Sequence, residues 1–346
     1  MRVVPVGTRK LKPSTVDEGG LLRMAWLGVG SAFAALNSQT NVLVVKGETL
    51  LLIDCGTTAS RMLVEIGLTP LDIPAVLPTH SHADHVGGLE ELALKGRYMA
   101  PFVKGGAKGD HKPTCVITEE YQSYLWNFSL RGGLAFSEQM VVDGTPGEMR
   151  FTDYFEPLRP RPISGYDRPS YRVEHGDLEM ILMRTKHIPE EPDNWEDCFW
   201  SCGVVLDGKV FYPGDTRLDL ELLQQYVTDE IEAIFHDSQS FPGGVHASLE
   251  ELKTLPQEFR ERMWLVHLDD NMLKLDGEAA KQIDAALEAM SDLRASEETT
   301  PQMLFEGHLA VQRAKEHAMD AAESVVRSYG FAGIARPATE CYYDFA

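Results

Sequence analysis

The residues best suited to chemistry lie in one short stretch, residues 79–88, which reads THSHADHVGG. It places His80, His82, Asp84 and His85 within six consecutive positions. Alternate side chains of an extended segment project to the same side, and a turn into a following helix brings His85 round to the others. Because imidazole and carboxylate groups are a typical ligand set for zinc-like ions, this stretch predicts a metal site.

Three further candidate ligands stand at the ends of apolar segments downstream. They are His187 in RTKHIP, Asp215 in YPGDTR and His267 in LVHLDD. Taken singly, each is an ordinary polar residue that closes a strand. Four ligands cannot satisfy two metal ions, whereas the combined set of seven can.

The elements that must position these side chains form two related halves of short strands. In the first half, a hairpin turns at residues 46–48 and ends at Asp54, and the strand IPAVLP leads into the histidines. In the second half, a strand ends at His187, and a hairpin turning at residues 207–208 ends at Asp215. EAIFHDS and MWLVHLDD add two short strands. This partial repeat favours two packed sheets with helices outside them.

Two regions depart from the strand pattern. Roughly residues 97–177 are rich in Gly, Pro, Lys and Arg around the aromatic segment EEYQSYLWNFSL, and are interpreted as an insertion. Residues from about 272 to 346 are expected to form a helical C-terminal part. Since no convincing linker divides the chain, we expect one domain over residues 1–346.

Composition narrows the function classes. Lys and Arg number 32 against 53 Asp and Glu, a formal net charge of −21 that disfavours a large nucleic-acid partner. The five cysteines are scattered and odd in number, as expected for reduced thiols. The N-terminal 20 residues lack the apolar core of a secretory signal, and no apolar run reaches membrane-spanning length. We therefore expect a cytoplasmic protein.

These motifs resemble the metallo-β-lactamase superfamily, whose signature is His-x-His-x-Asp-His, and within it ribonuclease Z and related cyclic-nucleotide phosphodiesterases. WLGVGS, LLIDCG, THSHADHVGGL, FYPGDTR, FHDSQSF and VHASLEEL occur in the family's order between about Met24 and Asn271. The resemblance implies an α/β fold, the metallo-β-lactamase αββα sandwich, here with an inserted segment and C-terminal helices.

The resemblance also implies a dinuclear centre. Zinc is the favoured ion, with manganese or iron as alternatives. One ion would be held by His80, His82 and His187, the other by Asp84, His85 and His267, and Asp215 would bridge them. Asp54 is interpreted as a buried group that supports the ligands.

The implied activity is that of a phosphodiesterase acting on a small substrate such as a cyclic nucleotide. A hydroxide that bridges the two ions would attack the phosphorus, with Asp84 orienting it and accepting its proton. His246, in GGVHASLEEL, would protonate the leaving oxygen. The alternative for His246 is a loop histidine without a role.

Two other activities stay open. A tRNA 3′-processing endonuclease of the ribonuclease Z type is disfavoured by the acidic composition and by HLDDN after the last ligand, where that enzyme usually has a Ser-x-Arg segment. A thioester or lactone hydrolase such as glyoxalase II shares the metal motif but needs no proton donor like His246. A homodimer is expected by analogy with relatives.

Overall fold

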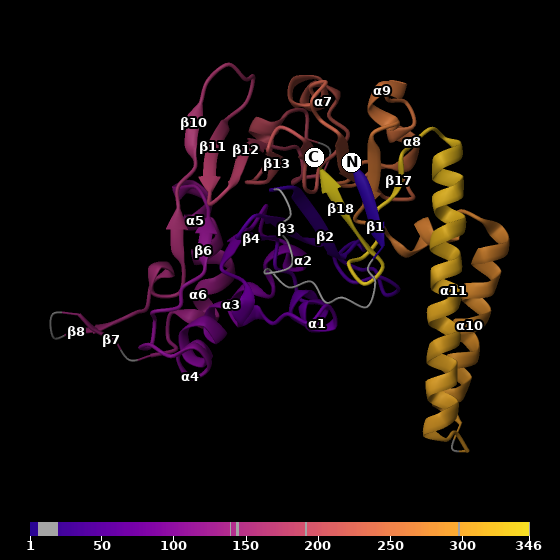
Figure 1. Cartoon of the computed structure of the whole chain (residues 1–346), viewed down its shortest axis with the longest axis horizontal. Coiled ribbons are helices and arrows are strands. Elements are labelled where there is room, and N and C mark those ends of the chain that lie inside the picture. Colours follow the sequence, from indigo (N-terminus) through magenta and orange to yellow (C-terminus); the bar gives the residue numbers. More distant parts are fainter. Residues whose placement is uncertain (6–19, 139, 143–144, 191, 297, 346) are drawn as a thin grey trace.

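Two eight-stranded sheets pack face to face in the computed structural model (Figure 1). Helices α1 (Ala59–Glu65) and α3 (Leu89–Leu94) lie beside the first sheet, and α7 (Leu220–Tyr226) and α8 (Leu249–Leu252) beside the second. This is the metallo-β-lactamase αββα arrangement expected from the sequence. The structure describes residues 1–5, 20–138, 140–142, 145–190, 192–296 and 298–345.

The first sheet combines an antiparallel part with a parallel part. Strands β3 and β4 form the antiparallel hairpin expected at residues 46–48, and β4, β5, β6 and β9 then run parallel. In spatial order the strands are β1 (Arg2–Pro5), β18 (Cys341–Phe345), β2 (Leu22–Gly28), β3 (Asn41–Lys46), β4 (Thr49–Ile53), β5 (Ala75–Leu77), β6 (Thr114–Val116) and β9 (Glu156–Leu158).

The second sheet repeats this design. The hairpin of β13 and β14 turns at Asp207, and β14, β15, β16 and β17 then run parallel. In spatial order the strands are β10 (Arg161–Ile163), β11 (Ser170–His175), β12 (Leu178–Arg184), β13 (Cys202–Leu206), β14 (Val210–Tyr212), β15 (Ala233–Asp237), β16 (Met263–Val266) and β17 (Gly333–Ile334). The partial repeat in the sequence is therefore a repeat of strand topology.

Alternation along the strands divides the core into layers. Trp26 of β2 lies between the sheets, with its ring centroid 5.3 Å from Tyr212 and 5.1 Å from Phe235 of the second sheet. The next residue, Leu27, packs on the opposite face with Leu63 of α1. Because successive side chains of a strand point to opposite faces, each sheet buries apolar residues on both sides.

The expected insertion is more regular than its sequence indicated. Strands β6 and β9 extend the first sheet, β10 and β11 begin the second, and the aromatic segment forms α5 (Glu119–Leu125) followed by a π-helix at Trp126–Leu130. The interpretation of these residues as mainly irregular was wrong, because most of their strands have only three residues and are too short to show an alternation. The remaining α-helices and strands of the described residues are α2 (Ala83–Val86), α4 (Ala100–Lys104), α6 (Arg131–Leu134), β7 (Met140–Val142), β8 (Thr145–Gly147) and α9 (Gln257–Arg260).

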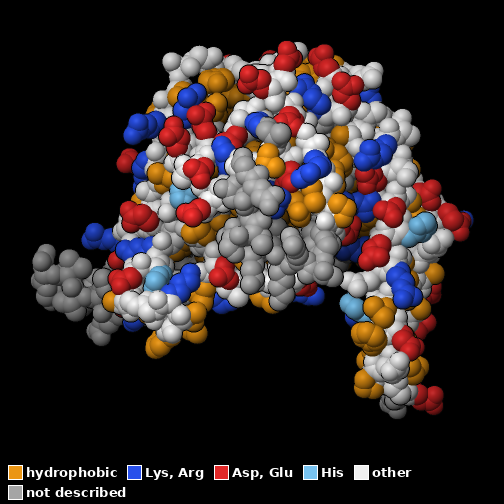
Figure 2. All heavy atoms as spheres, in the orientation of Figure 1, with side chains coloured by type: hydrophobic (Ala, Val, Ile, Leu, Met, Phe, Trp, Pro, Cys, Tyr) orange, Lys and Arg blue, Asp and Glu red, His pale blue; other side chains and the backbone are white. Residues whose placement is uncertain are grey.

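The C-terminal part is helical only in its first portion. Helices α10 (Gly277–Ala295) and α11 (Pro301–Ser328) form an antiparallel pair that projects away from the sheets (Figure 1). Hydrophobic side chains are visible along this pair (Figure 2), and the exposed ones include Phe305. The chain then returns as β17 and β18, so the expectation of helix to residue 346 was wrong at its end. The division into one domain stays a prediction.

The sequence led us to expect neither a secretory signal nor a membrane-spanning segment, and the structure bears on these two expectations only in part. Residues 6–19, which make up most of the N-terminal segment judged not to be a secretory signal, lie outside the described residues. Within the described part of the chain, every helix is too short or too polar to cross a membrane.

Strand β18 provides a test of the fold. Tyr343 is fully buried, with its ring 5.2 Å from Phe235 and 5.4 Å from Trp264, whereas Tyr342 is partly exposed. Removing a large buried ring leaves a cavity, so Tyr343→Ala should lower the free energy of unfolding by about 3–5 kcal/mol. Tyr342→Ala, the matched control, should cost less than half as much in urea unfolding. Equal losses would contradict the proposed role of β18 in the core.

Candidate metal centre

The predicted site residues gather where strands of both sheets end. Asp54 follows β4, His267 follows β16, and Asp215 lies three residues after β14. Asp54 and His267 have φ angles of 62° and 57°, a left-handed conformation that is uncommon for residues other than glycine. Such backbone strain concentrates at functional sites, where the surrounding fold maintains it.

Glycine at position 214 lets Asp215 reach the site. Gly214 has a φ angle of 66°, and a Cβ atom there would lie 3.0 Å from the carbonyl oxygen of Cys202. Both the backbone conformation and the close approach therefore favour glycine. The result is a tight turn that presents the Asp215 carboxylate to residues from the first half of the chain.

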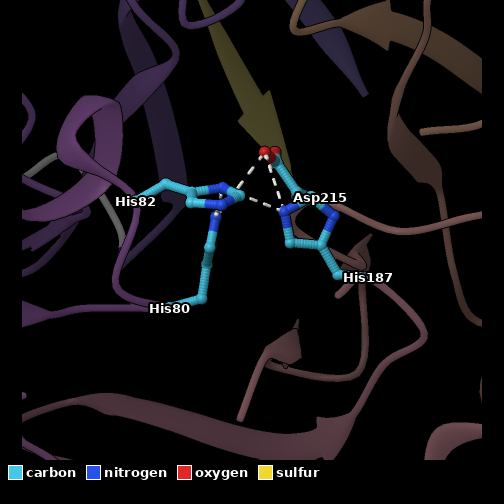
Figure 3. Close-up of side chains that lie close together, drawn as sticks. All are labelled: His80, His82, His187 and Asp215. Carbon is cyan, nitrogen blue, oxygen red and sulfur yellow. Dashed lines mark hydrogen bonds and ion pairs between the residues drawn. The ribbon is translucent and has the colours of Figure 1, made fainter. Parts of the chain in front are cut away.

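One group of predicted ligands consists of three imidazoles and a carboxylate (Figure 3). His82 Nδ1 lies 3.0 Å from His80 Nε2 and 3.1 Å from His187 Nε2. Asp215 Oδ2 lies 3.8 Å from His80 Nε2 and 3.9 Å from His187 Nε2. Four donor atoms from both halves of the chain thus point at one small volume.

The second group contains two carboxylates and two imidazoles. Asp84 Oδ2 lies 3.1 Å from both His85 Nε2 and His267 Nε2. Asp215 Oδ2 lies 3.1 Å from His85 Nε2 and 3.2 Å from His267 Nε2. The structure therefore brings together all seven residues predicted as ligands, in two groups that share Asp215.

The donor sets fit divalent cations. Donors that share one tetrahedral zinc ion at about 2.0–2.1 Å lie about 3.3 Å apart, close to the separations within both groups. Asp215 Oδ1 is buried and has no hydrogen-bond partner within the described part of the chain, as expected of an oxygen that faces a cation. The fold and these buried His and Asp clusters are consistent with a divalent metal site. The individual ligand roles stay a prediction.

The pKa shifts favour the protonation states that metal binding needs. Burial lowers the pKa of His187 to about 4 and that of His80 well below its usual value, so both rings are neutral at pH 7. Burial alone would raise the pKa of Asp84, but hydrogen bonds with His267 and His85 outweigh it and lower that pKa. Neutral imidazole and ionised carboxylate are the ligating forms.

His85 shows the opposite shift because it lies among buried carboxylates. Burial alone would lower its pKa, but Asp215 and Asp54 outweigh burial and raise it well above the usual value. Buried carboxylates require compensating positive charge. In the protein without metal, a proton on His85 supplies part of that charge.

A surrounding set of hydrogen bonds orients the predicted ligands. Asp54 Oδ2 lies 2.7 Å from His85 Nδ1, and Asp54 Oδ1 accepts a 2.7 Å hydrogen bond from the backbone N–H of Thr79. His187 Nδ1 lies 3.0 Å from the carbonyl oxygen of Val245. In His85 and His187 the opposite nitrogen, Nε2, faces the ligand cluster, which is the usual arrangement around a metal site.

His246 lies beside both groups and has a carboxylate partner that the sequence did not identify. Its Nδ1 is 2.9 Å from Asp237 Oδ2, and its ring centroid is 5.1 Å from His187 and 4.6 Å from His267. Burial alone would lower the pKa of His246, but Asp237 and Asp215 outweigh burial and raise it. Asp237 ends a buried strand and is itself part of the FHDSQSF motif, the sequence signal that could have indicated its role.

Sequence comparison connects the chain with one family. The family model described as Anti-Pycsar protein Apyc1 matches residues 22–287. An Anti-Pycsar protein Apyc1 from Paenibacillus harenae is 35% identical over 257 residues, covering 74% of this chain and 93% of the relative. One from Bacillus phage vB_BsuM-Goe3 is 32% identical over 267 residues, covering 75% of this chain and 93% of the relative.

Structure comparison confirms the predicted fold. The metallo-β-lactamase fold protein YhfI from Bacillus subtilis superposes with a TM-score of 0.53 at 13% identity, over 94% of this chain and all of that protein. A diphosphatase from the PhnP family superposes with a TM-score of 0.50 at 15% identity, over 72% and 87% of the two chains. At sequence identities of 13% and 15%, these superpositions show a shared fold and not a shared activity.

The shared carboxylate leads to a prediction on metal content. Protein purified without chelator should hold close to two divalent ions per chain by elemental analysis. Asp215→Ala removes a donor from both groups and should reduce the content by more than one ion, whereas His82→Ala affects one group and should reduce it by at most one. Retention of two ions by Asp215→Ala would contradict a shared ligand.

Proposed function

The chain belongs to the Anti-Pycsar protein Apyc1 family, and we propose that it hydrolyses a small phosphodiester, such as a cyclic nucleotide, at a dinuclear metal centre. It is a metal-dependent hydrolase with the metallo-β-lactamase fold. The observation that carries the proposal is the pair of ligand groups joined at Asp215, with the His246–Asp237 pair beside them.

The predicted ligands have separate tasks in this reaction. Two divalent ions, when bound, lower the pKa of a water molecule and stabilise the entering and leaving oxygens of the phosphoryl group. One oxygen of Asp84 faces His85 and His267, and its carboxylate is proposed to orient the attacking water and accept its proton. Asp54 keeps His85 in position through its 2.7 Å contact with Nδ1.

His246 is proposed to supply the proton that the leaving oxygen needs. Its Nδ1 is engaged with Asp237, which leaves Nε2 as the nitrogen able to reach a substrate. Asp237 Oδ2 also accepts a 3.1 Å hydrogen bond from the backbone N–H of Thr216, which fixes the carboxylate and hence the orientation of the ring. A carboxylate that holds an imidazole by one nitrogen prepares the other for proton transfer.

Two features favour a small phosphodiester over the competing substrates: the His246–Asp237 pair and the net charge of the chain. A thiolate leaves readily without protonation, so a thioester hydrolase gains little from an imidazole held in this way. A tRNA substrate is disfavoured by the net charge of −21, since phosphate binding relies on local excess of Lys and Arg.

The proposal also includes the location, the oligomeric state and the metal expected from the sequence. The enzyme is proposed to be a cytoplasmic homodimer that uses zinc, with manganese or iron as alternatives.

Substitutions should separate the tasks of Asp84 and His246. Asp84→Ala should nearly abolish hydrolysis of every phosphodiester, because it removes both a predicted ligand and the proton acceptor. His246→Ala should lower kcat by about 10²–10⁴ on a cyclic nucleotide, the usual scale for general acid catalysis. With bis-p-nitrophenyl phosphate the loss should be far smaller, because p-nitrophenolate leaves without a proton.

Steady-state rates on both substrates, with metal content measured in parallel, check this prediction. His308→Ala on α11 removes an exposed histidine and serves as the control with unchanged rates. Equal losses on both substrates with metal retained would show that His246 binds or positions the substrate. No loss on either would remove its role and favour the thioester alternative.

A further inference from the structure

An aromatic pocket of about 330 Å³ opens next to the candidate metal centre. His82, a predicted ligand, forms part of its wall, and the rest is largely aromatic: Tyr121, Tyr124, Phe128, Phe199 and Trp200. The lining residues include no lysine, arginine or carboxylate. The volume falls within the range of small-molecule sites, and the aromatic, uncharged lining of the pocket suits a flat, uncharged group.

The pocket has a rigid floor. Tyr121 and Trp200 are 2% and 7% exposed, and their rings stack 5.6 Å apart at an interplanar angle of 9°. The Ser81 hydroxyl donates a 3.2 Å hydrogen bond to the Tyr121 hydroxyl, which links this floor to the residue before His82. Floor and predicted ligand are therefore fixed relative to each other.

The mouth of the pocket exposes rings to solvent. Phe128 is 80% exposed and Phe199 is 62% exposed. Tyr124 stands one helical turn before Phe128, with ring centroids 5.9 Å apart. Large apolar groups left in water at the edge of a polar site are typical of a binding surface.

Another side of the pocket, formed by Ile188 and Phe199, is held next to His187, a predicted ligand. The backbone N–H of Phe199 donates a 2.8 Å hydrogen bond to the carbonyl oxygen of Ile188, the neighbour of His187. Arg184 is buried and donates to the carbonyl oxygen of Phe199 at 2.9 Å, while its guanidinium lies 5.0 Å from the ring centroid of Trp200. One side of the pocket is thus anchored beside His82, which follows β5 of the first sheet. The other is anchored beside His187, which follows β12 of the second sheet.

We propose that this aromatic pocket binds the nucleobase of the substrate by stacking, with Phe128 and Phe199 as determinants of substrate affinity. The proposal rests on the proposed phosphodiesterase function and names the part of the substrate that lies outside the metal centre. A nucleotide carries one anionic group and one flat aromatic group, and the chain places predicted ligands for divalent cations beside an aromatic pocket. Stacking of a base on an aromatic side chain contributes about 1–3 kcal/mol.

The test compares two substrates with the same phosphodiester ring. One is a 3′,5′-cyclic nucleotide and the other is 1-deoxyribose 3,5-cyclic phosphate, which has no base. Phe128→Ala and Phe199→Ala should each raise KM about tenfold for the nucleotide, corresponding to about 1.4 kcal/mol, with kcat changed less than threefold. KM for the baseless substrate should not change. Phe128→Tyr, which keeps a ring, should retain the wild-type KM.

The control is Phe102→Ala, which removes a ring that is 85% exposed on α4, outside the pocket. Unchanged KM values for the nucleotide in a Phe128→Ala/Phe199→Ala double variant would overturn the proposal. So would equal increases with both substrates. A double variant that is a monomer where the wild-type protein is a dimer, with unaltered KM, would also overturn the proposal. That result would show that the exposed rings contact a second copy of the chain and not the nucleobase.

A binding measurement separates this proposal from the function on which it rests. If the wild-type protein hydrolyses neither cyclic substrate, the proposed function fails. Adenosine binding to metal-stripped protein then tests whether the pocket binds a nucleobase. Adenosine carries the base without a phosphate. Saturable binding that the double variant loses and Phe102→Ala retains would support stacking in the pocket. Equal binding by all three proteins, or none, would overturn it.

Discussion

The site depends on the Asp215 carboxylate, which is buried where the two sheets meet. Its Oδ2 atom belongs to both groups of predicted ligands, and its Oδ1 atom has no hydrogen-bond partner within the described residues. Together with Asp54 and Asp84 it concentrates negative charge in a place that water reaches poorly. Such an arrangement is unfavourable unless cations or protons compensate it, and bound cations would account for the four imidazoles that point at the same carboxylate oxygen.

The sandwich architecture meets this requirement by supplying side chains from strand ends. Each sheet contributes a hairpin followed by parallel strands, so the segments after β4, β5, β14 and β16 converge at one edge. Left-handed backbone at Asp54 and His267 shows that the site imposes conformations that the fold must stabilise. The apolar layers around Trp26 and Leu27 provide that stability.

The sequence predicted which candidate ligands would come together better than it predicted the sheet edges, for physical reasons. Four candidate ligands lie within six consecutive positions, and the others were expected at the ends of apolar strands, so residue type and position agreed. Strand β18 was missed because it is short and pairs with β1 and β2, over 300 residues away; Asp344 within it binds Arg23 at 2.6 Å. The role of Asp237 was missed because its contact with His246 depends on a loop conformation that no local pattern specifies. The aromatic pocket draws residues from separate segments, and its exposed rings were indistinguishable from core residues in the sequence.

Hydrolysis of a 3′,5′-cyclic nucleotide in oxygen-18 water tests the central claim most directly. The account predicts that protein holding close to two divalent ions per chain forms a nucleoside monophosphate with one heavy oxygen in its phosphate. Chelation should abolish the reaction, and readdition of metal should restore it. If protein with both ions bound forms no monophosphate while it cleaves a thioester, the account of this site as a phosphodiesterase centre is contradicted.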